Sequence, residues 1–172
     1  MITWQKMMVD AYGRIPEKLE AALKGLSKAD LEWRPGPLAN SIGWLAWHLA
    51  RGQDKQIAAL MGKEQLWVKD GWYKKFERSA DPADTGYGHS AAQVKAFRSP
   101  GSKTQMDYLR AVNARTKRYI LSLKPAELNR KLNEPQWKPL PTVGVRIVSI
   151  LGDGQQHLGQ AAYIRGLRKV KK

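Results

Sequence analysis

The sequence predicts an all-α protein whose main body is a four-helix bundle. Three observations carry this prediction. Four long segments repeat apolar residues at helical spacing, strand patterns are scarce, and one long irregular segment joins the second helix to the third. A chain of 172 residues with 42% hydrophobic residues has the size of one domain and enough apolar side chains for a core. We therefore expect a single domain over residues 1–172, with a basic tail at 168–172.

The first helix is expected within residues 2–26, where leucine recurs at helical spacing. Pro16 lies inside this stretch, where it either starts the main helix at its first turn or kinks a longer one. The next segment, Ser27-Lys-Ala-Asp30, has the spacing of a capping box with Asp in place of the usual Glu. It predicts a short helical turn.

The second helix is expected over about residues 41–61, where Asn40-Ser41 supplies the N-cap. Glycine and proline interrupt residues 62–103, so we expect an irregular connection there. A connection of this length is uncommon in a compact domain and tends to be functional.

The second half of the chain contains the other two long helices. One is expected at about 104–122, and a short turn begins at Lys124-Pro-Ala-Glu127. The proline-rich segment 134–141 then leads into a final helix at about 142–167.

Composition excludes several classes of chemistry. The chain has no cysteine, so it has no disulfide, no zinc–thiolate site and no cysteine nucleophile. No apolar run is long enough to span a membrane, and the N-terminus lacks the pattern of a signal peptide. We expect a cytoplasmic protein with no membrane partner.

Positive charge is concentrated in the second half of the chain. Residues 1–85 have 13 Lys/Arg against 11 Asp/Glu, residues 86–172 have 17 against 4, and the net charge is +15. This distribution indicates an anionic partner, such as a small molecule or nucleic acid, or simply a highly charged surface. No nucleic-acid-binding motif supports nucleic acid as the partner.

Three residues on two predicted helices have the chemistry of a metal site. His48 lies in the middle of the second helix, while Asp153 and His157 are four residues apart and share one face of the last helix. Two imidazoles and a carboxylate pointing into a bundle can hold a divalent metal and leave positions open. The same residues also fit a hydrogen-bonded histidine and an ordinary ion pair, so this alternative stays open.

Five further residues are candidates for a surrounding pocket. Trp44 is one turn from His48, and Arg146 and Gln160 lie near the face that carries Asp153 and His157. Tyr87 and His89 lie in a glycine-rich loop that is expected either to fold over the pocket as a source of protons or to form a surface turn.

Two motifs resemble those of the DinB/YfiT-like superfamily, in particular its DinB_2-type branch. The first is Glu32-Trp-Arg-Pro35 followed by Asn40-Ser-Ile-Gly-Trp-Leu-Ala-Trp-His48-Leu-Ala50. The second is Gly152-Asp153-Gly-Gln-Gln-His157-Leu-Gly-Gln160-Ala-Ala-Tyr-Ile-Arg165-Gly166. With the helix order, the likeness covers nearly the whole chain. It implies a bundle of up-down-down-up topology that is often a homodimer.

The resemblance also implies a metal site and an activity. The family binds Zn, Ni or Mn through a histidine of the second helix, matched by His48, and a His-x-x-x-His pair of the last helix, in which His157 matches and Asp153 replaces the first histidine. Characterised relatives use low-molecular-weight thiols as substrates, and many members have no known activity.

Three functions follow from these observations. The leading hypothesis is a metal-dependent transferase in which a divalent ion (Zn, Ni, Mn or Fe) at His48, Asp153 and His157 activates a low-molecular-weight thiol, or water in a hydrolytic variant. Its substrate is expected to be a small molecule with an anionic group. The alternatives are a non-enzymatic basic protein that binds nucleic acid or another polyanion, and a bundle without activity.

Overall fold

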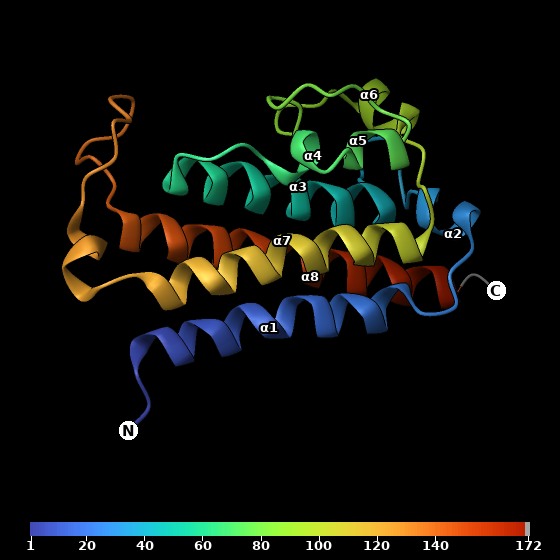
Figure 1. Cartoon of the computed structure of the whole chain (residues 1–172). Coiled ribbons are helices and arrows are strands. Elements are labelled where there is room, and N and C mark those ends of the chain that lie inside the picture. Colours follow the sequence, from blue (N-terminus) through green and yellow to red (C-terminus); the bar gives the residue numbers. More distant parts are fainter. Residues whose placement is uncertain (171–172) are drawn as a thin grey trace.

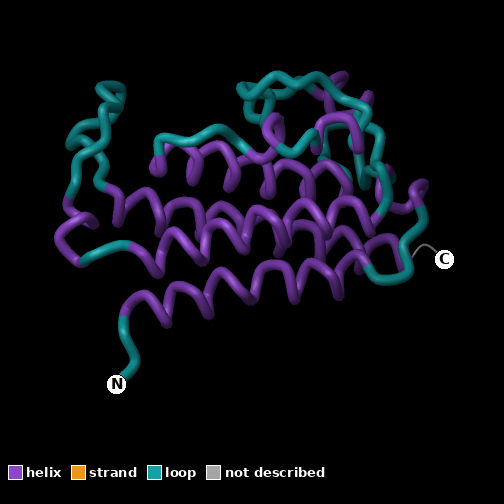
Figure 2. Tube along the Cα trace, in the orientation of Figure 1, coloured by secondary structure: helices purple, strands orange, loops and turns teal. Residues whose placement is uncertain are grey.

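The computed structural model describes residues 1–170, and helices account for most of them (Figures 1 and 2). In chain order these are α1 (Trp4–Leu23), α2 (Lys28–Glu32), α3 (Ile42–Met61), α4 (Leu66–Lys69), α5 (Trp72–Lys75), α6 (Ala91–Ala96), α7 (Ser102–Ser122), the 3₁₀ helix η1 (Pro125–Asn129) and α8 (Val143–Val170). Within residues 1–170 there is no strand, only one isolated β-bridge between Lys131 and Thr142.

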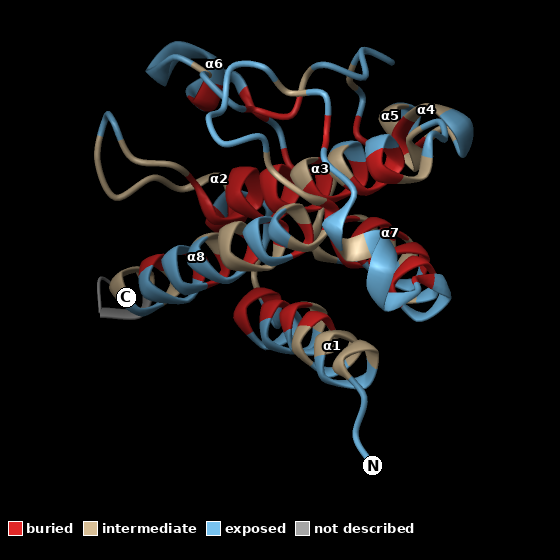
Figure 3. Cartoon of the chain, turned by 90° about the vertical axis from the view of Figure 1, so that its left-hand side faces the viewer, coloured by how far each residue is buried: buried red, intermediate tan, exposed pale blue. Residues whose placement is uncertain are grey.

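The four long helices form the predicted bundle. α1 and α8 run in one direction, and α3 and α7 run in the other (Figure 1). α3 packs against α8 and α7, and α1 packs against both α7 and α8. The helix order is therefore up-down-down-up, as the resemblance implies, and the apolar faces of all four helices meet in one core (Figure 3).

Several helix boundaries follow the predicted signals. Ser27 and Asp30 form the expected capping box of α2, and Ser41 caps α3. The first helix ends at Leu23 rather than at residue 26, because the backbone of Lys24 already leaves the helical path at ψ 123° and Gly25 follows with a left-handed φ of +74°. Pro16 lies inside α1.

The long connection differs from the irregular segment that we predicted, since it contains α4, α5 and α6. Asp54, on the buried face of α3, accepts hydrogen bonds from the backbone N–H groups of Leu66 and Trp67 at 3.0 and 2.9 Å and from the hydroxyl of Tyr108 at 2.9 Å. Arg51 is fully buried and donates to the Asp84 carbonyl at 3.1 Å. These charged groups attach the connection to α3.

The last helix is longer than expected. α8 continues to Val170, so the first part of the predicted basic tail is helical. Within it, Arg168 forms an ion pair with Asp30 at 3.0 Å, which joins the end of α8 to α2. Residues 171–172 of that tail lie outside the described residues. No helix in residues 1–170 combines the length and apolar character that crossing a membrane requires.

Candidate metal centre

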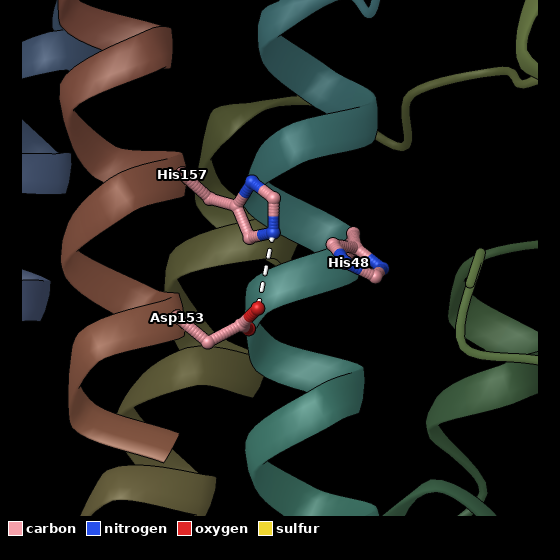
Figure 4. Close-up of side chains that lie close together, drawn as sticks. All are labelled: His48, Asp153 and His157. Carbon is pink, nitrogen blue, oxygen red and sulfur yellow. Dashed lines mark ion pairs between the residues drawn. The ribbon is translucent and has the colours of Figure 1, made fainter. Parts of the chain in front are cut away.

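The predicted histidines and carboxylate meet between α3 and α8. His48 lies on α3, and Asp153 and His157 lie one turn apart on the facing surface of α8 (Figure 4). One ligand atom from each residue lies within 4.8 Å of the other two. The ring centroids of His48 and His157 are 4.6 Å apart, and the two ring planes are nearly perpendicular. This spacing makes the three side chains a candidate group for holding one ion.

His48 is oriented by the backbone of the long connection. Its Nδ1 lies 2.5 Å from the carbonyl oxygen of Thr85. Because a carbonyl only accepts hydrogen bonds, Nδ1 carries the proton and Nε2 keeps a free lone pair. Trp44 stacks on the imidazole at a centroid distance of 4.7 Å and fixes the plane of the ring. A hydrogen bond from the other ring nitrogen is the usual support of a metal-binding histidine.

The contact between Thr85 and His48 depends on Gly86. Its φ of +87° is a conformation that side chains other than glycine rarely adopt. A Cβ at this position would lie 2.8 Å from both Trp44 and Trp47 and 3.2 Å from Nδ1 of His48. Glycine therefore lets the loop approach α3 closely enough to bond His48.

His157 is oriented in a similar way by its own helix. Its Nδ1 donates to Oε1 of Gln160 at 2.9 Å, and its Nε2 faces Oδ1 of Asp153 at 3.3 Å. In both histidines an oxygen binds Nδ1, so Nε2 is the nitrogen that remains available to a metal ion. Asp153 is 43% exposed and His157 16%, so one side of the centre is open to solvent.

The electrostatics of the three groups suit a cation. Burial lowers the pKa of His48, so its imidazole is neutral at pH 7. The hydrogen bond from His157 lowers the pKa of Asp153, which is ionised. Burial opposes a charge on His157, but the hydrogen bonds with Asp153 and Gln160 outweigh it and raise its pKa. The carboxylate therefore attracts positive charge to Nε2 of His157, whether as a proton or as a metal ion.

The five predicted pocket residues have different surroundings. Trp44 and Gln160 contact the two histidines directly. His89 does not face the centre: its Nε2 is 3.0 Å from Asp84, and its Nδ1 accepts a hydrogen bond from the Trp44 indole at 3.3 Å. Both of its ring nitrogens are therefore occupied, and its role is to hold the loop.

Tyr87 and Arg146 line a groove of about 950 Å³ that His48, Asp153 and His157 do not line. Tyr87 is 91% exposed at the tip of its loop. The Arg146 guanidinium forms an ion pair with Glu134 and donates to Gln56 at 2.9 Å. The sequence did not point to two residues that orient His48, Thr85 and Gly86. The pair of glycines around Tyr87 marked the loop, but a backbone carbonyl has no signature in the sequence.

The fold and the site define a class: a four-helix bundle with a His/Asp/His group between two of its long helices. Residues 11–161 match the sequence family DinB_2, described as the DinB superfamily, and the chain belongs to that superfamily. The structure is similar to the crystal structure of a conserved protein from Enterococcus faecalis, with a TM-score of 0.88 and 30% sequence identity over 96% of each chain. A comparison with curated proteins gives no match.

Proposed function

We propose that this protein is a metal-dependent enzyme that uses a divalent ion at His48, Asp153 and His157 to activate a small thiol or water. The observation that carries the proposal is the orientation of the two histidines. Each has its Nδ1 bonded to an oxygen, which leaves Nε2 available, and one ligand atom from each of His48, Asp153 and His157 lies within 4.8 Å of the others. Neutral imidazoles with bonded second nitrogens are the usual ligands of such sites.

The residues present fit a divalent metal in charge and in number. Two neutral imidazoles and one carboxylate supply three ligands and leave coordination positions for a substrate, as catalytic sites require. A bound divalent ion lowers the pKa of a thiol or a water molecule so that the deprotonated nucleophile exists near neutral pH. Asp153 neutralises part of the ion's charge, and Trp44 keeps water away from one side of His48.

The absence of cysteine from the chain determines where a sulfur nucleophile could come from. Because the chain contains no cysteine, a thiol reaction at this centre requires a thiol from a second molecule. The partly exposed side chain of Asp153 marks the side from which that molecule enters. We infer the hydrolytic variant from the same site, with water in the place of the thiol.

The test is the metal content of untagged protein, measured by elemental mass spectrometry. We expect near-stoichiometric Zn, Ni, Mn or Fe in the wild type and its loss in Asp153→Asn and His157→Ala. Asp70→Asn, which removes an exposed carboxylate far from the centre in sequence, is the matched control and should keep the metal. A wild type that is empty and refuses added metal would overturn the proposal.

The alternative, a protein that binds a polyanion, predicts a different result for His157→Ala. The observation that favours it is the charge of residues 86–172, with 17 Lys/Arg against 4 Asp/Glu. Binding driven by phosphate contacts falls steeply with salt concentration and would survive His157→Ala. Metal-dependent turnover would be lost in that variant at any salt concentration.

A further inference from the structure

The groove beside the metal centre is built from α3, α8, the loop at Tyr87 and the segment that connects η1 to α8. It contains two clusters of side chains that the metal does not need. One is cationic and the other is aromatic. Figure 1 shows this connecting segment rising beside the ends of α3 and α8 that meet there. Because α3 and α8 also carry His48, Asp153 and His157, the groove and the centre lie along the same pair of helices.

The cationic cluster consists of Lys55, Arg130, Lys131 and Arg146, and within residues 1–170 Glu134 is the only acidic residue that lines the groove. Glu134 forms an ion pair with Arg146, which leaves three positive charges uncompensated within the groove. Among the described residues, Lys55 and Lys131 have no carboxylate within ion-pair distance. Groups arranged in this way favour an anion.

Arg146 is held in place from both sides. It donates to Oε1 of Gln56 at 2.9 Å, across the contact between α3 and α8, and it forms its ion pair with Glu134 on the connecting segment. Arg130 donates to the carbonyl oxygen of Leu60 at 3.1 Å, which positions its guanidinium at the same end of α3. Arg146 therefore fixes the connecting segment against α3, while the guanidinium of Arg130 has a fixed orientation and is pre-organised for a carboxylate or a phosphate.

The aromatic cluster supplies an apolar surface beside these charges. Trp137 is 58% exposed on the connecting segment, and Tyr87 is exposed on the opposite loop. Exposed large aromatic side chains beside a groove are typical of binding sites, because one end of the ring contacts the ligand while the other stays in water. The groove thus offers an apolar contact and an anion-binding contact to one molecule.

The helices set the distance between the two subsites. Arg146 precedes Asp153 by seven residues on α8, and Gln56 follows His48 by eight on α3. At about 1.5 Å per residue, the anion-binding end lies roughly 10 to 12 Å along the helices from the metal centre. Gly52 lies between them on α3, where a Cβ would meet only Asp153 at 3.7 Å. Because Gly52 has no side chain, no group projects from α3 at this position between the two subsites.

We propose that this groove binds the anionic end of an elongated substrate whose reactive group lies at His48, Asp153 and His157. The anion is a carboxylate or a phosphate, and about 10 Å separate it from the reacting atom. This inference rests on the proposed metal function for the reacting end, while the anion subsite is defined by the groove alone. The two parts can therefore be tested separately.

The first test uses metal-free protein and two simple anions, inorganic pyrophosphate and glutarate, which separate the phosphate and carboxylate sources. Binding is followed by ¹H–¹⁵N NMR at the side chains of Trp137 and Arg146. We expect saturable shifts at both residues, and affinity at least about tenfold lower in Lys55→Ala/Lys131→Ala. The matched control, Lys6→Ala/Lys18→Ala, removes the same charge from α1 and should bind as the wild type does. Equal weakening in both double variants, or no saturable shift with either anion, would overturn the anion subsite.

The second test measures the distance between the subsites with cobalt-substituted protein. Mercaptopropionate, mercaptohexanoate, mercaptooctanoate and mercaptoundecanoate place a thiol and a carboxylate at increasing separations, and sulfur-to-cobalt absorption reports binding. We expect affinity to be highest at mercaptooctanoate, with that preference absent for the corresponding mercaptoalcohols and in Lys55→Ala/Lys131→Ala. Affinity that does not depend on chain length would overturn the proposed substrate shape. Failure to bind cobalt would count against the metal function, whereas the anion titration would still decide the groove.

Discussion

Replacement of Gly86 by alanine tests the link between the long connection and the metal centre. The new Cβ would lie 2.8 Å from the rings of Trp44 and Trp47 and 3.2 Å from Nδ1 of His48. Trp47 is fully buried, so neither ring system can move away without disturbing the core. The loop must shift instead, and the 2.5 Å hydrogen bond between Thr85 and His48 is the contact that it loses first.

Gly88 provides a matched control in the same loop. Its φ is +75°, similar to the +87° of Gly86, but a Cβ there would meet no atom within 4 Å. Alanine at Gly88 therefore incurs only the backbone penalty of the left-handed region, about 1 to 2 kcal/mol. Alanine at Gly86 adds the cost of overpacking, about 1 to 3 kcal/mol, so its total destabilisation is roughly 2 to 5 kcal/mol.

Urea unfolding of the two metal-free variants measures this difference, and titration with a divalent metal measures its effect on the centre. The loss of a hydrogen bond that orients a ligand typically lowers metal affinity by about 10- to 100-fold. We expect that loss for Gly86→Ala and near wild-type affinity for Gly88→Ala. If the two variants have the same stability and the same metal affinity, the loop does not position His48 and the reasoning is wrong.

Three other substitutions test the site and its surroundings. Asp153→His should keep a bound metal, because imidazole also binds divalent ions, but competition experiments should show a shift from Mn toward Zn. Gln160→Leu removes the acceptor of His157 and should lower metal affinity by about tenfold or more in the same titration. Burial opposes the charge of Asp84, but Arg78 outweighs it and lowers the pKa, so Asp84→Asn should destabilise the fold at pH 7. Because the folded-state pKa of Asp84 is depressed, its contribution to stability is present above the ordinary pKa of about 4 and is lost as the pH falls through the folded-state pKa. Urea unfolding of the wild type and the variant should therefore show a smaller difference in stability at about pH 3 than at pH 7.

The bundle could be predicted because each long helix contains its own signal. Ser27 and Ser41 cap α2 and α3 as expected, and the periodic apolar residues mark the buried faces. The connection was predicted less well, because α4 and α5 are only four residues long and have no periodicity to detect. They depend on tertiary contacts instead: Asp54, far away in the sequence, accepts the N–H groups at the start of α4.

The metal centre could be predicted only in part, for a similar reason. The spacing of Asp153 and His157 places both on one face of α8, a local property of the sequence. That His48 lies opposite them follows from the antiparallel packing of α3 and α8, which the family resemblance implied and the structure confirms. His89 has the same chemistry as His48, yet it faces Asp84 and Trp44. Residue type alone does not distinguish the two histidines.

From the sequence, the loop that carries Tyr87 could either fold over the pocket or form a surface turn. Its contacts in the structure indicate a fixed support. Arg51 lies three residues from His48 on α3 and donates to the Asp84 carbonyl, and the next residue, Thr85, accepts the hydrogen bond of His48. Arg51 on α3 thus fixes the loop at Asp84, and the loop in turn fixes the imidazole of His48 through Thr85. A segment that opened and closed would break a bond of a buried arginine at each cycle, which is costly in a low-dielectric interior. The Tyr87 side chain, with a flanking glycine on each side, extends into solvent, and it borders the groove rather than the centre. The long connection therefore serves to hold His48 in its orientation, and the centre is open to solvent on the side of Asp153.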